Sequence, residues 1–275
     1  MKFTDNVITG RQNPTVLRVH KLREKKFRDT ERVFLLDGYK LFMEARQKKA
    51  DIVKVYLCET LYEKLPCDVI GIISKEYSDR TVVLSESCFM KISDEKAPQG
   101  IIAEINHLDK WKLFTKIYND EISSNERILL LDSIQDPGNM GTILRSGAAF
   151  GIDRIICGGS CADITNPKVL RASMGAALSL NVDYVSDTAL AIEKLTSLGR
   201  RVFSAELKSD SVRLSDIEIL GSDVFFIGNE GKGIPEHLSV LCSDSVFIPM
   251  TDKTESLNAG VAASVCLWTQ YSKLL

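Results

Sequence analysis

The chain has 275 residues, which exceeds the usual length of one domain and suggests about two. Hydrophobic residues make up 44% and charged residues 26%, a balance typical of a folded globular protein and not of a disordered or fibrous one. No stretch approaches the roughly 18 consecutive apolar residues that a membrane-spanning helix needs, and the first residues lack the apolar core of a secretory signal. We therefore expect no membrane association and no export.

The cysteines indicate the compartment. There are seven, scattered along the chain with no CxxC pair, which is typical of reduced thiols inside a cell. Only three histidines accompany them, so we expect no metal site. These features predict a cytoplasmic protein.

The net charge of −2 hides an uneven distribution. Residues 10–54 contain thirteen Lys or Arg against six Asp or Glu, so this segment is strongly basic and residues 55–275 are acidic. A basic end on an acidic body suggests that one part of the molecule binds a polyanion. A solvated helical face is an equally good reading of the charge alone.

The first part of the chain alternates between strand and helix patterns. Asn13 and Pro14 predict a helix start, with the helix over 14–26. A second helix is expected at 39–49, from apolar residues at helical spacing. Strands are expected at 33–38, 52–58, 69–74, 81–85 and 100–105. We predict an α/β domain over 1–105, followed by a polar linker over 106–126.

The second part opens with RILLLDSI (127–134), a nearly continuous apolar run typical of a strand buried on both faces of a parallel sheet. Further strands are expected at 153–159, 179–185, 201–207, 223–230 and 244–250, and helices at 139–150, 166–175, 187–198, 234–241 and 256–272. This pattern predicts a second α/β domain over 127–275, with an open, doubly wound sheet that binds ligands beyond the carboxyl ends of its strands.

The common nucleotide fingerprints are missing from the loops of this second domain. GNEGKGIPE matches neither a P-loop nor a GxGxxG motif, and there is no GxSxG elbow and no HExxH. Three loop-helix junctions remain, at 135–151, 225–236 and 248–268. Taken singly they decide nothing: Arg145 could contact phosphate or form a surface ion pair, and Ser256 could simply cap a helix.

Taken together and in this order, the three junctions are specific. DPGNMGTILRSGAAFG, IGNEGKGI and IPMTDKTESLNAGVAAS closely resemble the three signature motifs of the SpoU/TrmH family of RNA methyltransferases. The stretch ERVFLLDGYKLFMEA resembles part of that family's substrate-binding domain, and APQGIIAEI (97–105) resembles its end. The resemblance covers nearly the whole chain. Gly147 stands where many members carry Ala, a small departure.

The resemblance implies an enzyme that transfers a methyl group from S-adenosylmethionine to a ribose 2′-hydroxyl of RNA. It implies a SPOUT-type catalytic domain with a C-terminal trefoil knot, a homodimer with the site at the subunit interface, and an N-terminal domain like a ribosomal protein. By position, the resemblance assigns catalytic roles to Asn139, Arg145, Glu230, Ser256 and Asn258, and cofactor contacts to Gly228, Ile248 and Leu257.

The basic segment then becomes a candidate for binding the RNA backbone. Its first seven cations are the predicted contacts: Arg11, Arg18, Lys21, Arg23, Lys25, Lys26 and Arg28. The substrate domain favours large-subunit rRNA over tRNA, because tRNA members usually lack one. Two further alternatives stay open, a catalytically silent RNA-binding scaffold and a metabolic α/β enzyme, although the latter leaves the basic segment unexplained.

Overall fold

The computed structural model describes residues 6–115 and 122–275 and forms two compact units. The first unit contains the described part of 1–108 together with 163–178, and the second contains that of 109–162 with 179–275. The expected second domain, 127–275, thus contributes one segment, 163–178, to the first unit.

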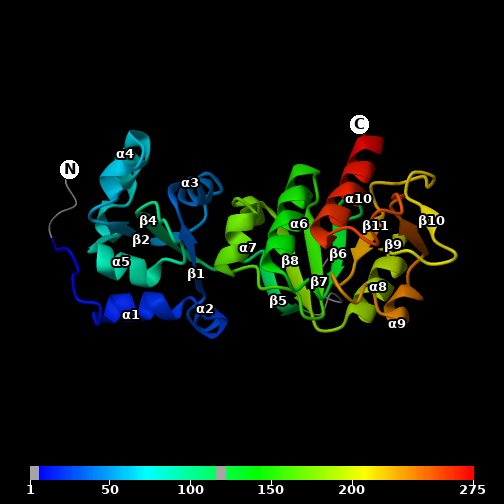
Figure 1. Cartoon of the computed structure of the whole chain (residues 1–275), viewed down its shortest axis with the longest axis horizontal. Coiled ribbons are helices and arrows are strands. Elements are labelled where there is room, and N and C mark those ends of the chain that lie inside the picture. The colour runs from blue at the N-terminus through cyan, green and yellow to red at the C-terminus, as the bar shows by residue number, and fades with distance from the viewer. Residues whose placement is uncertain (1–5, 116–121) are drawn as a thin grey trace. The chain divides into compact units, whose positions relative to one another are not determined.

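The first unit is built on a four-stranded mixed sheet (Figure 1). Strand β4 runs antiparallel to its neighbours β1 and β2, and β3 joins β2 in parallel. The strands lie in the order β1 (Val33–Asp37), β4 (Ile101–Asn106), β2 (Ile52–Cys58) and β3 (Thr81–Leu84).

Six α-helices accompany this sheet among the described residues: α1 (Pro14–Lys21), α2 (Lys25–Glu31), α3 (Tyr39–Gln47), α4 (Cys67–Glu76), α5 (Glu86–Ile92) and α7 (Pro167–Ala172). Alternate residues of β1 are buried on opposite faces: Val33 and Leu35 share a core with α1 and α5, and Phe34 and Leu36 are buried on the other side.

Two expectations for this unit are wrong. The helix expected over 14–26 is divided into α1 and α2 by a break at Leu22–Glu24. The strand expected at 69–74 is part of helix α4, which begins after Pro66 and buries Val69 and Ile73, four residues apart on one helix face. A short apolar run cannot be assigned to strand or helix by periodicity alone.

Arg28 fastens segment 163–178 inside the first unit. Its side chain is buried, and its guanidinium donates to Asp163 Oδ2 at 2.6 Å and to Thr165 Oγ1 at 2.9 Å. The same group donates to the carbonyls of Leu22 and Arg23, at 2.9 and 2.7 Å. All three nitrogens therefore have partners inside the unit.

The second unit is built on an eight-stranded sheet in which every pair of neighbouring strands is parallel, as the sequence predicts. The order is β10 (Val212–Arg213), β12 (Asp244–Phe247), β9 (Val202–Ala205), β11 (Val224–Ile227), β6 (Ile128–Asp132), β7 (Arg154–Gly158), β8 (Asn181–Val185) and β5 (Trp111–Thr115). Strand β5 lies within the expected linker, 106–126; residues 116–121 of that linker lie outside the described residues.

Helices cover both faces of this sheet. Figure 1 shows α6 (Pro137–Ala149) and α10 (Ala259–Lys273) on one side and α8 (Thr188–Ser197) and α9 (Glu236–Ser239) on the other. Leu195 of α8 and Leu238 of α9 share a core with Leu130 of β6. No helix within the described ranges is long and apolar enough to span a membrane.

Candidate active site

The site lies where the chain switches from one half of the second sheet to the other. Strand β6 has β7 on one side and β11 on the other, so the loops after β6 and β11 leave the sheet side by side. In an open parallel sheet, ligands bind beyond the carboxyl ends of the strands at such a switch point. The loops after β6, β11 and β12 carry the three sequence motifs.

One residue from each motif joins a hydrogen-bonded group, which we call the polar cluster: Asn139, Glu230 and Asn258. Asn139 donates through Nδ2 to Glu230 Oε1 at 3.1 Å, and Asn258 donates through Nδ2 to Asn139 Oδ1 at 2.7 Å. The polar cluster therefore connects residues 119 positions apart.

Helix caps hold two members of the polar cluster in place. Asp136 caps α6 by accepting from the backbone N–H of Asn139 at 2.8 Å, with Pro137 in the first helical turn. Asn258 caps α10, since its Oδ1 accepts from the backbone N–H of Gly260 at 3.0 Å. The two helices approach closely at Gly260, where a Cβ would lie 3.1 Å from Thr142 Cβ.

Glu230 is the charged member of the polar cluster. Partial burial raises the pKa of its carboxyl, but the hydrogen bonds from Asn139 and from the backbone N–H groups of Gln135 and Asp136 outweigh that effect and lower the pKa overall. The carboxylate therefore stays ionised at neutral pH and fixes the orientation of the Asn139 amide.

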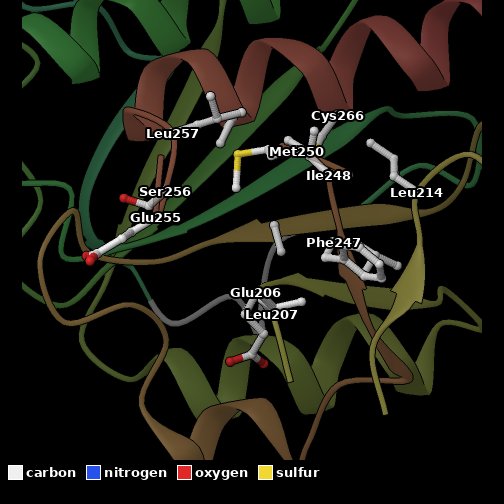
Figure 2. A pocket seen from close by; sticks show the side chains of 13 residues that line it. Glu206, Leu207, Leu214, Phe247, Ile248, Met250, Glu255, Ser256, Leu257 and Cys266 are labelled. Carbon is white, nitrogen blue, oxygen red and sulfur yellow. The ribbon is translucent and has the colours of Figure 1, made fainter. Parts of the chain in front are cut away.

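A cavity of about 180 Å³ is lined by the third motif and by strand ends (Figure 2). Ile248, Leu257 and Ser256 line it, so three residues to which the resemblance assigns cofactor or catalytic roles share one cavity wall. Sequence reasoning missed Leu207 and Met250, which line it from the loops after β9 and β12. Their side chains are 73% and 42% exposed, so two large apolar groups border an open cavity.

Gly228 lies outside the cavity lining. A Cβ at this position would approach the carbonyl oxygen of Gly233 to 2.7 Å, so glycine lets the chain after β11 fold back on itself. Asn229 and Gly233 exchange backbone hydrogen bonds at 3.1 and 3.0 Å and close this turn. The turn places Glu230 against the first motif.

Arg145 lies apart from the polar cluster. It is exposed on α6, and its guanidinium has no hydrogen bond or ion pair with any residue of 6–115 or 122–275. Six residues separate it from Asn139, which corresponds to about 240° around the helix. One chain alone therefore does not bring the predicted catalytic arginine to the other predicted catalytic residues.

The seven predicted RNA contacts fall into three groups. Arg11, Lys21 and Lys26 are exposed, and Lys21 lies over the ring of Phe27. Arg18, Arg23 and Lys25 form ion pairs: Arg18 with Glu104 and Glu31, Arg23 with Asp94, and Lys25 with Asp29. Arg28 is buried and fully engaged, so the expectation that it contacts RNA is replaced by the structural role described above.

No group of three or more His, Cys, Asp or Glu side chains in the described part of the chain is placed to hold a metal ion.

Comparisons with known proteins agree with the geometry. Residues 126–268 match the model of the SpoU rRNA Methylase family, and residues 13–103 match that of an MRM3-like substrate binding domain. The chain is 30% identical over 261 residues to the 23S rRNA (guanosine(2553)-2'-O)-methyltransferase RlmP of Bacillus subtilis, covering 95% of this chain and 97% of that protein. It is 28% identical over 220 residues to the 23S rRNA (guanosine-2'-O-)-methyltransferase RlmB of Coxiella burnetii, covering 79% and 86%.

Solved structures show the same fold. An rRNA methyltransferase from Sinorhizobium meliloti superposes with a TM-score of 0.82 at 25% identity, over 98% of both chains. An AdoMet-bound rRNA methyltransferase structure from the same organism gives a TM-score of 0.81 at 24% identity, again over 98% of both chains. The three motifs, the polar cluster that joins them and the family match over 126–268 lead to one conclusion: this chain belongs to the SpoU rRNA methylase family.

Proposed function

We propose that this protein methylates a ribose 2′-hydroxyl of large-subunit rRNA, using S-adenosylmethionine as the methyl donor. The observation that carries the proposal is the polar cluster, which unites all three family motifs in the unit that holds the cavity of Ile248, Ser256 and Leu257. The names of the Bacillus and Coxiella relatives support 23S rRNA as the substrate, and the match to a substrate binding domain favours it over tRNA. We also propose a cytoplasmic location, because the Bacillus and Coxiella relatives are bacterial rRNA enzymes.

The side chains that line the open cavity suit the proposed cofactor. The walls are mainly apolar, from Leu207, Ile248, Met250 and Leu257, and Ser256 adds a polar group. Such a lining suits a ligand with apolar faces and a few polar groups that set its orientation. When bound, S-adenosylmethionine supplies an electrophilic methyl group on a positively charged sulfur.

The residues of the chain would mainly position the hydroxyl and stabilise developing charge. The ionised Glu230 holds Asn139, whose amide can then orient the ribose. A guanidinium is a poor general base, so Arg145 would act through its charge and its planar array of N–H donors. We assign it to stabilising the alkoxide that develops on the ribose and to binding the neighbouring phosphate.

A second copy of the chain would supply Arg145. This residue is exposed on α6, about 240° around the helix from Asn139, and α6 packs beside α10. On α10, Val261 and Trp268 are 45% and 50% exposed and lie seven residues apart, on one face. An exposed apolar face on α10, and on the neighbouring α6 a cation without a partner among the described residues, suit a homodimer interface that completes the site.

The trefoil knot that the family resemblance implies belongs to the same proposal. Helix α10 packs against both α6 and β11, so the C-terminal segment returns to the middle of the unit after lining the cavity. We propose that the knot lies in this returning segment, next to the cavity.

Cofactor binding and substrate class test the proposal together. Leu257→Asp places a charge in the apolar wall and should weaken S-adenosylmethionine binding at least about 10-fold by calorimetry. Val240→Asp is the matched control. Val240 is 67% exposed and lies outside the lining, so this variant should bind S-adenosylmethionine normally.

In a second experiment, methyl-labelled S-adenosylmethionine should label separated rRNA and not tRNA. Unchanged binding by Leu257→Asp would contradict the cofactor site, and label in tRNA alone would contradict the rRNA assignment.

A further inference from the structure

The first unit contains a cavity of its own, of about 210 Å³. It lies at the carboxyl end of β1, where Asp37 and Lys40 line it beside Leu41 of α3. Gln99 lines it from the segment before β4, and Arg171 from α7. The volume of this cavity is similar to the roughly 180 Å³ of the cavity lined by Ile248 and Leu257.

Asp37 lines this cavity, and one of its two carboxylate oxygens has no hydrogen-bond donor among the described residues. Its Oδ2 accepts a hydrogen bond from Ser93 Oγ at 2.5 Å, whereas its buried Oδ1 has no hydrogen-bond partner among the described residues. Burial raises the pKa of this carboxyl to about 6, against the hydrogen bond from Ser93; Glu95 and Asp94 raise it further, and Arg171 opposes them. Lys40 of α3 also lines the cavity. The carboxyl is therefore mainly ionised at pH 7 and above.

Donors line the same cavity. Arg171 pairs through Nε with Glu95 at 2.6 Å, and its buried Nη1 has no acceptor in the described ranges. Gln99 accepts through Oε1 from the backbone N–H of Tyr39 at 3.1 Å. This hydrogen bond fixes the orientation of the amide and leaves its Nε2 amine as a donor. Lys40 adds an exposed ammonium group.

Gly38, in the turn after β1, shows that the cavity wall is closely packed. Gly38 has a φ of 108°, which favours glycine, and a Cβ there would lie 2.8 Å from Gln99 Oε1. The turn after β1 and the segment before β4 therefore approach each other closely.

The charges of the lining select the ligand class. Two cations, Lys40 and Arg171, face two carboxyls, Asp37 and Glu95, so the cavity offers little net attraction to a phosphate. It offers instead an acceptor beside several donors, which matches the edge of a nucleobase. Guanine alone presents two neighbouring donors, N1–H and the N2 amine, beside the acceptor O6. A carboxylate can accept both donors, and Arg171, Lys40 or Gln99 can donate to O6.

We propose that this cavity binds a guanine base from an unpaired segment of the RNA substrate. The inference rests on the proposed function, since RNA must be the substrate for its bases to reach the first unit. The apolar side chains of Leu41 and Met174 line the same cavity and would contact the faces of the ring. The bound guanine would fix the register of the RNA on the enzyme and is distinct in role from the ribose that is methylated.

Binding of short RNAs to the full chain tests this inference. Fluorescence anisotropy would compare oligouridylates that carry one central guanosine, inosine or adenosine. Inosine lacks the N2 amine, so the guanosine RNA should bind about 10-fold or more tightly than either of the others. Asp37→Asn should remove this difference, whereas Asp68→Asn, the same change at an exposed position of the first unit, should keep it.

Two results would overturn the inference, and a third would contradict only the proposed function. Equal binding of the guanosine and inosine RNAs would overturn the guanine site, even if rRNA is methylated normally. Binding of free GMP as tightly as the guanosine RNA would overturn the assignment to RNA and indicate a nucleotide site. In the third, the natural protein prefers the guanosine RNA and Asp37→Asn does not, but the natural protein methylates no RNA. This result would support the guanine site and contradict only the proposed function.

Discussion

Arg145 carries a positive charge on an exposed helix face, with no partner in the described chain to neutralise it. We expect Arg145→Ala to reduce turnover at least about 100-fold, the usual cost of losing a group that stabilises transition-state charge. The Kd for S-adenosylmethionine should not change, because Arg145 does not line the cavity of Ile248 and Leu257. Single-turnover methyl transfer and calorimetry measure the two quantities.

Arg145→Lys separates charge from shape. Lysine keeps the charge but lacks the planar fork that binds two phosphate oxygens at once, so turnover should stay well below that of the natural protein. Near-normal turnover of Arg145→Lys across the pH range would contradict the proposed clamp on phosphate.

Asp37 makes stability depend on pH. Its pKa rises from an ordinary value of 3.8 to about 6 in the folded chain, so the folded state holds its proton over a range where the unfolded state has lost it. The free energy of unfolding should therefore fall as pH rises from about 4 to 6 and then level off, by about 3 kcal/mol in total. Asp37→Asn should lack this fall in urea titrations at a series of pH values. A fall of the same size in the variant would assign it to other groups.

The sequence motifs identified the polar cluster but not the whole cavity. Asn139, Glu230 and Asn258 lie in local patterns of capping residues and glycines that can be read along the chain. Leu207 and Met250 belong to no such pattern, since they line the cavity only because β9 and β12 are neighbours in the sheet. Residues that strand pairing alone brings together carry no local signal.

At the scale of elements, the buried ion pair of Arg28 and Asp163 fastens α7 to the first unit. Arg28→Ala would leave the Asp163 carboxylate buried without its partner, so we expect a loss of about 3–5 kcal/mol in the free energy of unfolding. Amide hydrogens of α7 should lose protection first, because that helix is only six residues long. Hydrogen exchange on the full chain measures both effects.

Lys26→Ala is the matched control in the same helix. Lys26 is exposed, and its replacement should change stability by no more than about 0.5 kcal/mol. Equal protection of α7 in the Arg28 and Lys26 variants would show that Arg28 does not hold this segment.

Prediction of the elements worked where periodicity was long and failed where it was short. The apolar run 127–134 became β6, and the capped pattern at 139–150 became α6. The six-residue run 69–74 carried no period, and packing made it part of α4. Strand β5 was hidden in a polar stretch because its place in the sheet comes from pairing with β8.

At the scale of the whole molecule, the proposed homodimer assembles each site from two chains. A dimer would arise from complementary surfaces, and the resemblance alone led us to expect it. In Arg145→Ala each chain keeps an intact polar cluster, and in Glu230→Ala each keeps the arginine. A heterodimer of the two variants, purified with two affinity tags, would contain one complete site and should have about half the natural turnover. A heterodimer as inactive as both parents would place Arg145 and Glu230 of one chain in the same site.

The proposed methyl transfer to a ribose oxygen can be tested by the position of a methyl label in the RNA. The enzyme would receive methyl-labelled S-adenosylmethionine and rRNA from cells lacking this protein, and the product would be hydrolysed in alkali. A methylated 2′-oxygen cannot attack the neighbouring phosphate, so ribose methylation predicts label in an alkali-resistant dinucleotide. Label released in a mononucleotide would show methylation of a base and would contradict methylation of the ribose.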